Sequence, residues 1–135
     1  MIDRLEHEIQ FNRNAMNLRG YRQELLASNI ANADTPHFKA KDIDFKTALS
    51  NVMAGRGEGS IELARTNSGH IEGSGPGAFD SQVKYRAEYQ GSVDGNTVNI
   101  DVERSAFTEN SVHMEALLSF LKDQFKEMQI AITGQ

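Results

Sequence analysis

Helical periodicity at the two ends of the chain is the strongest pattern of hydrophobic and polar positions. Between residues 1 and 33, apolar side chains recur seven residues apart, with further side chains at the intervening spacings of three and four. This row consists of Phe11, Ala15, Leu18, Arg22, Leu25, Asn29 and Asn32. Sustained seven-residue spacing is typical of a helix that packs lengthwise against another helix, so the pattern predicts an N-terminal coiled-coil helix over 1–33.

A second periodic stretch covers residues 102–135. Its seam, again spaced three and four, consists of Phe107, Asn110, Met114, Leu117, Leu121, Gln124, Met128 and Ala131. Asp101 and Glu103 place negative charge at the start of this stretch, where the helix dipole favours it. The sequence therefore predicts a mainly α fold in which long N- and C-terminal helices pack together as a coiled coil.

The segment that follows the first helix is expected to be extended. Pro36 ends the helical pattern, because the residue before a proline avoids the α region. Residues 34–53 are predicted to form an extended arm and then a short helix that begins near Asp44. Seven of the 11 glycines of the chain fall between residues 54 and 77, so a flexible loop is predicted over 54–80.

A β-rich segment is predicted over residues 81–101. The dipeptide Asp94-Gly95 is a strong turn signal, and apolar residues at 98, 100 and 102 then alternate with polar ones. We predict a strand over 97–101 that pairs with the segment around Val83 and Tyr85 in a small β-hairpin. A hairpin alone is only marginally stable in water, so we expect this one to pack against the helices.

Composition narrows the function classes. The formal net charge is -5, which argues against a nucleic-acid partner because such a partner requires a basic face. The chain has no cysteine, so disulfides and thiolate metal sites are excluded. No apolar run approaches the ~20 residues of a membrane span, and charges at Asp3 and Arg4 argue against a cleavable signal peptide.

The sequence shows no constellation of residues that carries chemistry. The four histidines are scattered, and the carboxylates of Asp42 and Asp44 lack the further oxygen ligands and the glycine of a calcium loop. The glycine-rich stretches lack the lysine and hydroxyl residue of a phosphate loop. We therefore predict no catalytic residue, no metal, no cofactor and no small-molecule substrate.

Three asparagines on the helical seams are unexpected, because an apolar residue would support a helix better there. Asn32 lies near a helix end, where capping is as good an explanation as any other. For Asn29 and Asn110 we favour a role in register. A buried amide must find a partner, so it penalises every misaligned packing, and we predict that these amides bond across helices in an assembled state.

The stretch from Arg22 to Pro36, with the sequence RQELLASNIANADTP, resembles the N-terminal signature of bacterial flagellar rod, hook and hook-associated proteins. The continuation from Phe38 to Phe45, together with blocks at 85–86, 92–98 and 101–110, is similar to the short proximal rod subunits of that family. The resemblance covers nearly the whole chain except residues 54–77.

This resemblance implies a structural subunit of the proximal rod, which polymerises helically, transmits torque and is required for flagellum-dependent motility. It implies export through the flagellar type III apparatus without a cleavable signal and assembly in the periplasm. The expected partners are copies of the chain, other rod proteins, the junction protein at the rod base, and the MS ring and export gate.

The residues that we assign to assembly come from both seams and from the hinge between helix and arm. They are Phe11, Leu18, Leu25, Asn29, Asn32, Thr35, Pro36, Phe107, Asn110, Met114, Leu117, Leu121 and Met128. Phe45 and Leu49 also fit the phenylalanine-x-x-x-hydrophobe pattern that is attributed in this family to recognition by the export gate.

Other functions remain open at the level of sequence. Another short rod subunit is the nearest alternative. A cytoplasmic helical-hairpin adaptor shares the two seams, but it gives no reason for the arm at 36–45 or for the β-rich middle. A small secreted enzyme with a catalytic Glu and Asp pair requires a pocket-forming core, and a hydrophobic content of 39% argues against one.

Overall fold

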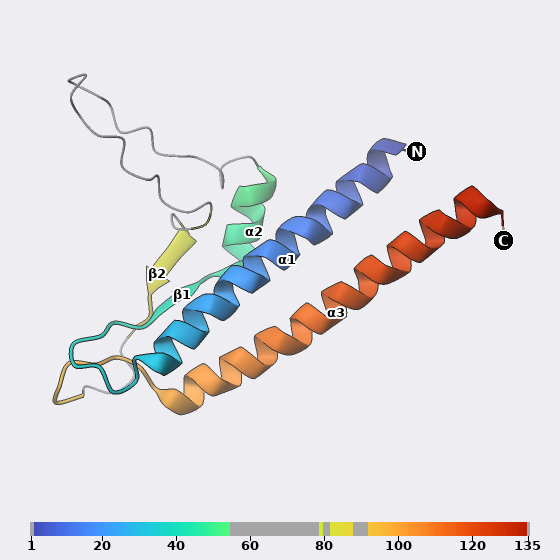
Figure 1. Cartoon of the computed structure of the whole chain (residues 1–135). Coiled ribbons are helices and arrows are strands. Elements are labelled where there is room, and N and C mark those ends of the chain that lie inside the picture. The colour runs from blue at the N-terminus through green and yellow to red at the C-terminus, as the bar shows by residue number, and fades with distance from the viewer. Residues whose placement is uncertain (1, 55–78, 80–81, 88–91, 135) are drawn as a thin grey trace, which may run out of the picture.

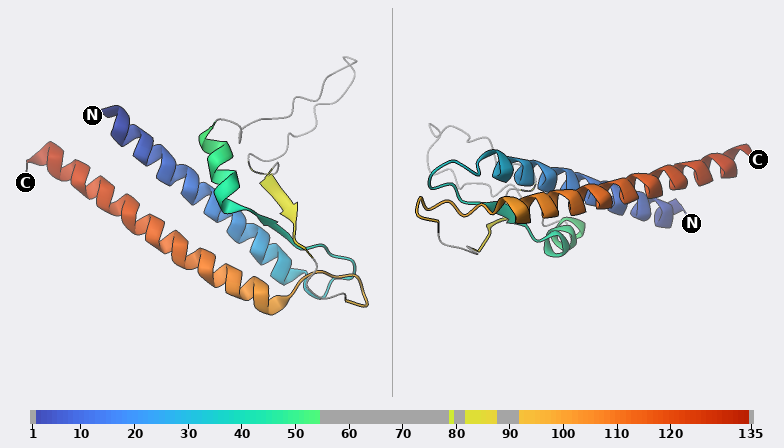
Figure 2. Two further views of the ribbon diagram at one scale, coloured as in Figure 1. Left: turned by 180° about the vertical axis from the view of Figure 1, so that it is seen from behind. Right: turned by 90° about the horizontal axis from the view of Figure 1, so that it is seen from below.

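Two long antiparallel helices form the body of the molecule (Figure 1). The computed structural model describes residues 2–54, 79, 82–87 and 92–134. Helix α1 spans Ile2–Ala31 and helix α3 spans Ile100–Thr133. They lie side by side with the two termini at the same end, as all views show (Figures 1 and 2). The predicted mainly α fold with two packed terminal helices is confirmed.

The arm after α1 carries a short strand and a short helix. Strand β1 spans Lys41–Ile43, and helix α2 spans Phe45–Met53 and packs against α1. Asp44 caps α2, since its side chain accepts hydrogen bonds from the backbone N–H and the hydroxyl of Thr47. The short helix predicted from Asp44 onward is therefore present.

The small sheet has two strands, as expected, but one of them is not the predicted one. Strand β2, Val83–Tyr85, pairs antiparallel with β1, and Lys41 lies opposite Tyr85. The predicted strand over 97–101 is wrong, because Asn99 caps α3 and the helix begins at Ile100. The side chain of Asn99 accepts hydrogen bonds from the N–H groups of residues 101 and 102. The sheet thus joins two distant segments rather than forming a local hairpin.

The predicted turn at Asp94-Gly95 is present, but it returns the chain to the arm instead of closing a hairpin. Gly95 has a φ of 72°, and a Cβ at this position would lie 2.9 Å from Nδ1 of His37. After the turn, the N–H of Thr97 donates to the carbonyl of Phe38, and its hydroxyl accepts from the N–H of Ala40. Residues 94–97 therefore run alongside the arm.

Helix α1 ends at Ala31, slightly before the predicted end at residue 33, and Pro36 follows in an exposed turn. Helix α3 closes at Gly134, which adopts the left-handed conformation. The flexible loop predicted over 54–80 falls almost wholly outside the described residues. No described helix combines the length and the apolar character needed to cross a membrane.

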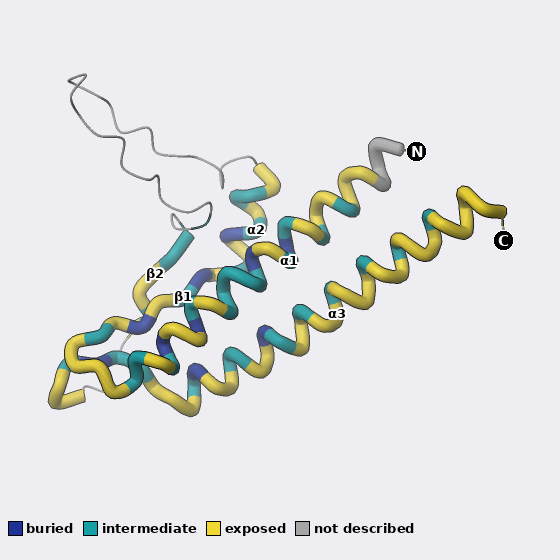
Figure 3. Tube along the Cα trace, viewed as in Figure 1, coloured by how far each residue is buried: buried dark blue, intermediate teal, exposed yellow. Residues whose placement is uncertain are grey.

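Buried residues are concentrated where α1 meets the arm, α2 and the first turns of α3 (Figure 3). Leu18, Ile43 and Ala48 form the hydrophobic centre, against which Leu25 and Phe45 are partly buried. The opposite ends of the two helices are mostly exposed. The tertiary contacts that hold the fold therefore lie at one end of the helical pair.

Candidate assembly site

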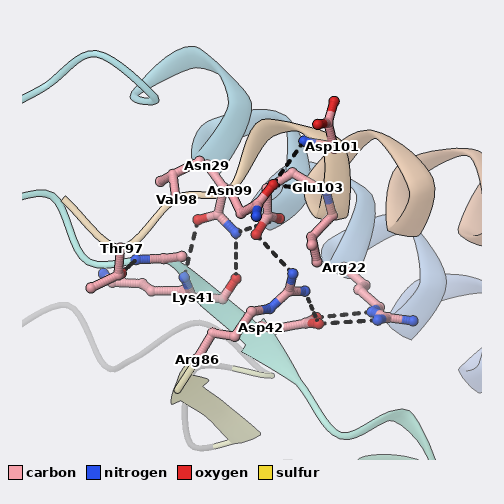
Figure 4. Close-up of polar contacts among 12 residues, drawn as sticks. Arg22, Asn29, Lys41, Asp42, Arg86, Thr97, Val98, Asn99, Asp101 and Glu103 are labelled. Atoms are coloured by element: carbon pink, nitrogen blue, oxygen red, sulfur yellow. Dashed lines mark hydrogen bonds and ion pairs between the residues drawn. The ribbon is translucent and has the colours of Figure 1, made fainter. Parts of the chain in front are cut away.

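Four charged side chains from four separate segments meet where the arm crosses the helices (Figure 4). Arg22 of α1 binds Asp42 of β1 through Nε and Nη2, at 2.9 and 3.0 Å. Arg86, which follows β2, donates to the same carboxylate at 2.5 Å and to Glu103 of α3 at 2.8 Å. We call these four residues, together with Asn29, the joint network.

The charges of the joint network balance, with two guanidinium groups and two carboxylates. The Glu103 side chain is 1% exposed, and the other three side chains are 15–19% exposed. Removing one member of a buried ion pair leaves its partner charged and unpaired, which is strongly destabilising. The network therefore favours the one arrangement in which all four segments are docked.

Asn29 links three elements at once. Its Nδ2 donates to the carbonyl of Lys41 at 2.7 Å and to Oε2 of Glu103 at 3.0 Å. Its Oδ1 accepts from the N–H of Lys41 at 3.0 Å. The amide therefore bonds both backbone groups of one residue of β1, as a neighbouring strand does, and also reaches α3. This geometry supports a register role for Asn29 within the subunit.

Asn110 is fully buried between the two long helices. Its Nδ2 donates to the carbonyl of Arg19 at 2.9 Å and to Oε1 of Gln23 at 2.6 Å. Its Oδ1 accepts from Nη1 of Arg19 at 3.2 Å. These bonds across helices form inside one chain, so they set the alignment of α3 against α1. A role of Asn110 in register between subunits stays a prediction.

The third asparagine, Asn32, has a local role. Its Nδ2 donates to the carbonyl of Ser28 at 2.8 Å, and its Oδ1 accepts from the hydroxyl of Thr35 at 3.1 Å. Both partners belong to the helix end or the turn that follows. Of the two explanations left open for Asn32, the geometry favours helix-end capping.

Sequence reasoning missed Asn96, which is 5% exposed. Its Nδ2 lies 2.8–3.0 Å from three backbone carbonyl oxygens in the turn that follows α1, those of Asn32, Ala33 and Thr35. Asn96 therefore ties the turn after α1 to the distant turn at residues 92–95. The only sequence signal was its place after Asp94-Gly95, which indicated a turn and no more.

The predicted seam residues do not all face the opposite helix. Leu18 and Leu25 of α1 pack on the hydrophobic centre formed with the arm and α2, whereas on α3 the seam position Asn110 bonds Arg19 and Gln23 of α1. Leu18 is fully buried, whereas Phe11 is 43% exposed. The others of the apolar set are half-buried, namely Leu25, Phe107, Met114, Leu117, Leu121 and Met128. Thr35 and Pro36 are exposed at the turn. The set thus takes part in two different contacts, that of α1 with the arm and α2 and that of α3 with α1.

Phe45 and Leu49 pack against the hydrophobic centre, on the first turns of α2. The Phe45 ring lies under the guanidinium of Arg19, which is 3.7 Å from the ring centroid. Within the described part of the chain, no group of three His, Asp or Glu side chains is arranged to hold a metal ion.

Comparison with known proteins identifies the family. A family model described as flagella basal body rod protein matches residues 9–39. The flagellar basal body rod protein FlgB of Salmonella typhimurium is 44% identical over 136 residues, which cover 99% of both chains. FlgB of Proteus mirabilis strain HI4320 is 42% identical over 98% of both chains, and FlgB of Escherichia coli K12 is 44% identical over 95% of this chain and 94% of its own. The chain belongs to the FlgB family.

As a FlgB-family member, the chain is a structural protein of the flagellar basal body rod and not an enzyme. The stretch matched by the family model, residues 9–39, contains Arg22 and Asn29 but stops before Asp42. The family signature therefore covers the α1 half of the joint network, while β1, Arg86 and α3 supply the other half.

The carboxyl group of Asp42 has a lowered pKa. Burial alone raises this pKa, but the hydrogen bonds from Arg22 and Arg86 and from the N–H of Ile43 outweigh it. The same bond from the other side raises the pKa of Arg22. An acid with a lowered folded-state pKa stabilises the fold above its unfolded-state pKa, and this contribution is lost as the pH falls through the folded-state value.

We therefore expect acid to weaken the joint in this FlgB-family chain. The free energy of unfolding of the unaltered chain should fall more steeply below about pH 4 than that of Asp42→Asn, which has no carboxylate to protonate. Urea unfolding at a series of pH values measures both curves. A constant difference between them from neutral pH down to pH values well below 4 would contradict the assignment.

Proposed function

We propose that this rod protein polymerises helically with copies of itself in the proximal part of the rod and transmits torque there. The joint network is the observation that carries the proposal. It fixes an outer arm to one end of a long helical pair through paired charges, while the other end of the pair leaves apolar side chains for neighbours. A subunit of this form suits a shaft with helices inside and arms outside.

The proposed partners follow from this role. They are neighbouring copies, other rod proteins, the junction protein at the rod base, and the MS ring with its export gate. The chain is proposed to reach the periplasm through the flagellar type III export apparatus without a cleaved signal. The apolar content of the two seams supports contacts with further helices of the same kind.

Co-sedimentation with purified basal bodies tests this function. An epitope-tagged chain expressed in a flagellated strain that lacks its own copy should restore swimming and sediment with rod-containing particles. The same chain in a strain without type III export should stay in the cytoplasmic fraction. A chain that stays cytoplasmic in the export-competent strain as well would instead favour the helical-hairpin adaptor.

We further propose that the export gate recognises Phe45 and Leu49 on the unfolded chain. In the folded subunit both side chains pack against the hydrophobic centre, and Arg19 covers the Phe45 ring. Phe45→Ala should therefore reduce the amount of exported chain about tenfold or more, because loss of an aromatic anchor at a binding site commonly costs at least 2 kcal/mol. Immunoblotting of periplasmic and cytoplasmic fractions measures this.

Leu18→Ala is the matched control for the gate prediction. Leu18 belongs to the same hydrophobic centre but lies outside the motif. Its truncation should lower the stability of the folded subunit by about 2–5 kcal/mol and leave export unchanged. Undiminished export of Phe45→Ala removes the gate assignment and leaves the structural role untouched.

A further inference from the structure

An open groove runs between the two long helices on the side where Gly20 lies. Its walls come from α1, from α3 and from one residue of the middle segment, and they are lined by Met16, Asn17, Gly20, Tyr21, Glu24, Phe79, Met114 and Leu118. A Cβ added at Gly20 would meet no atom within 4 Å, so the groove has free space at its centre. Glycine inside a helix costs about 1 kcal/mol relative to alanine, and no contact within the described part of the subunit explains its presence.

A second row of apolar side chains is exposed on the C-terminal half of α3. Leu118, Phe125 and Ile132 are spaced seven apart, and their exposed fractions are 43%, 56% and 85%. The three residues share one face of α3, because residues seven apart return to nearly the same side of a helix. Each of them directly follows a seam residue, so the row lies beside the seam. Its exposure increases away from the hydrophobic centre of the subunit.

Leu118 lines the groove, but Phe125 and Ile132, the outer members of the exposed row, do not reach it within one chain. Asn12 bonds Gln124 at 3.0 Å and Gln23 bonds Ser111 at 2.9 Å, which fixes the alignment of the two helices. Gly20 shares the groove with Met114, whereas Phe125 lies 11 residues further along α3, a displacement of about 16 Å. Phe125 can therefore enter the groove only from a second copy of the chain.

The charges on the groove wall and on α3 indicate which helix can bind in the groove and in which direction it runs. Glu24 lies one turn beyond Gly20 on the groove wall, and Lys122 lies about one turn before Phe125 on α3. Both side chains are exposed, and among the described residues neither has an ion-pair partner. When Phe125 of a second copy is placed at Gly20, an α3 that runs antiparallel to α1 brings its Lys122 to Glu24.

We propose that the C-terminal half of α3 from a second copy lies in this groove, with Phe125 at Gly20 and Lys122 against Glu24. This deepens the proposed function, on which it rests. The arriving α3 is parallel to the α3 of the receiving copy and is shifted along it by roughly 15–20 Å. The two contacting surfaces differ, so the contact is head-to-tail and extends into an open polymer rather than closing a two-fold dimer.

Cross-linking between singly substituted chains tests the contact. The chain has no cysteine of its own, so Glu24→Cys and Lys122→Cys each introduce the only thiol. The two variants, with different tags, are co-expressed in a flagellated strain, and basal bodies are treated with a short bis-maleimide. A species that carries both tags is expected. Glu127→Cys in place of Lys122→Cys is the control, because residue 127 lies on the opposite side of α3 from Phe125.

A larger side chain at position 20 provides an independent test of the groove contact. Gly20→Leu should reduce incorporation into basal bodies by about tenfold, because it fills the space that Phe125 of the neighbour occupies. Gly20→Ala, with one added methyl group, should have a much smaller effect, and the helicity of both purified variants should be unchanged or higher.

The outcomes separate this contact from the proposed function. Equal cross-linking with the Glu127→Cys control, or normal incorporation of Gly20→Leu, overturns the groove contact while the unaltered chain still sediments with basal bodies. Absence of the unaltered chain from basal bodies overturns both proposals. Cross-linking specific to Glu24→Cys with Lys122→Cys, together with loss of incorporation for Gly20→Leu, establishes the contact.

Discussion

Glu103→Ala is expected to lower the free energy of unfolding by about 3–5 kcal/mol. The Glu103 carboxylate is 1% exposed and receives hydrogen bonds from Arg86 at 2.8 Å and from Asn29 at 3.0 Å. Alanine leaves the guanidinium without one of its two carboxylate partners and removes one acceptor of the amide. Urea unfolding followed by far-UV circular dichroism measures the loss.

Glu115→Ala is the matched control, since Glu115 is an exposed glutamate on the same helix. Its truncation should change stability by no more than about 0.5 kcal/mol. Glu103→Gln keeps the shape and one acceptor but removes the charge, so its cost should lie between the two. Equal losses for Glu103→Ala and Glu115→Ala would show that the joint network does not hold the fold.

Asn29→Leu should cost about 3 kcal/mol, because it leaves the partly buried N–H and carbonyl of Lys41, and the buried Glu103 carboxylate, without their amide partner. The physical effect differs from that of Glu103→Ala, because the loss is at the contact between α1 and the arm. Hydrogen exchange should therefore accelerate at the amide of Lys41 more than at amides in the middle of α3. Exchange measured by NMR resolves these sites separately.

Asn32→Leu provides the comparison within the same helix end. The Asn32 amide bonds Ser28 and Thr35, both local, and none of its side-chain bonds reaches the arm. Its replacement should cost about 1 kcal/mol, as for loss of a helix cap, and should leave exchange at Lys41 unchanged. If both asparagine variants released the arm equally, the distinction drawn between Asn29 and Asn32 would be wrong.

Periodicity predicted the helical parts of this structure because the seam residues repeat over many turns. The buried and half-buried positions of α3 from Phe107 to Met128 recur at the predicted spacing, and α1 ends within two residues of its predicted end. The α1 row, in contrast, packs on the arm and α2. The family resemblance rests first on the stretch from Arg22 to Pro36, where the two asparagines depart from what a helix alone requires. Both signals are local in sequence.

The joint network could not be predicted in the same way, because its members lie 17 to 44 residues from their ion-pair partners and repeat at no interval. The position of Glu103 in the sequence indicates only that its charge favours the start of the helix. The arm carries both polar and apolar residues on each face, and this pattern is a partial indication of the joint network. Ala40 is buried and Asp42 bonds two arginines on one face, while on the other face Ile43 is buried although Lys41 is exposed, so the alternation is not clean. The predicted strand over 97–101 is wrong, because alternation of apolar and polar residues over only five positions also occurs where a chain enters a helix.

The concentration of buried side chains at one end of the helical pair has a mechanical consequence. At the joint end, a closed set of charged and amide contacts links arm, strands and both helices, so that end is stiff in a single subunit. At the other end the two helices are exposed along most of their surface and bend more easily. In the shaft that we propose, resistance to twisting at these helix ends then comes from neighbouring subunits, and it rises only as each end is enclosed by them.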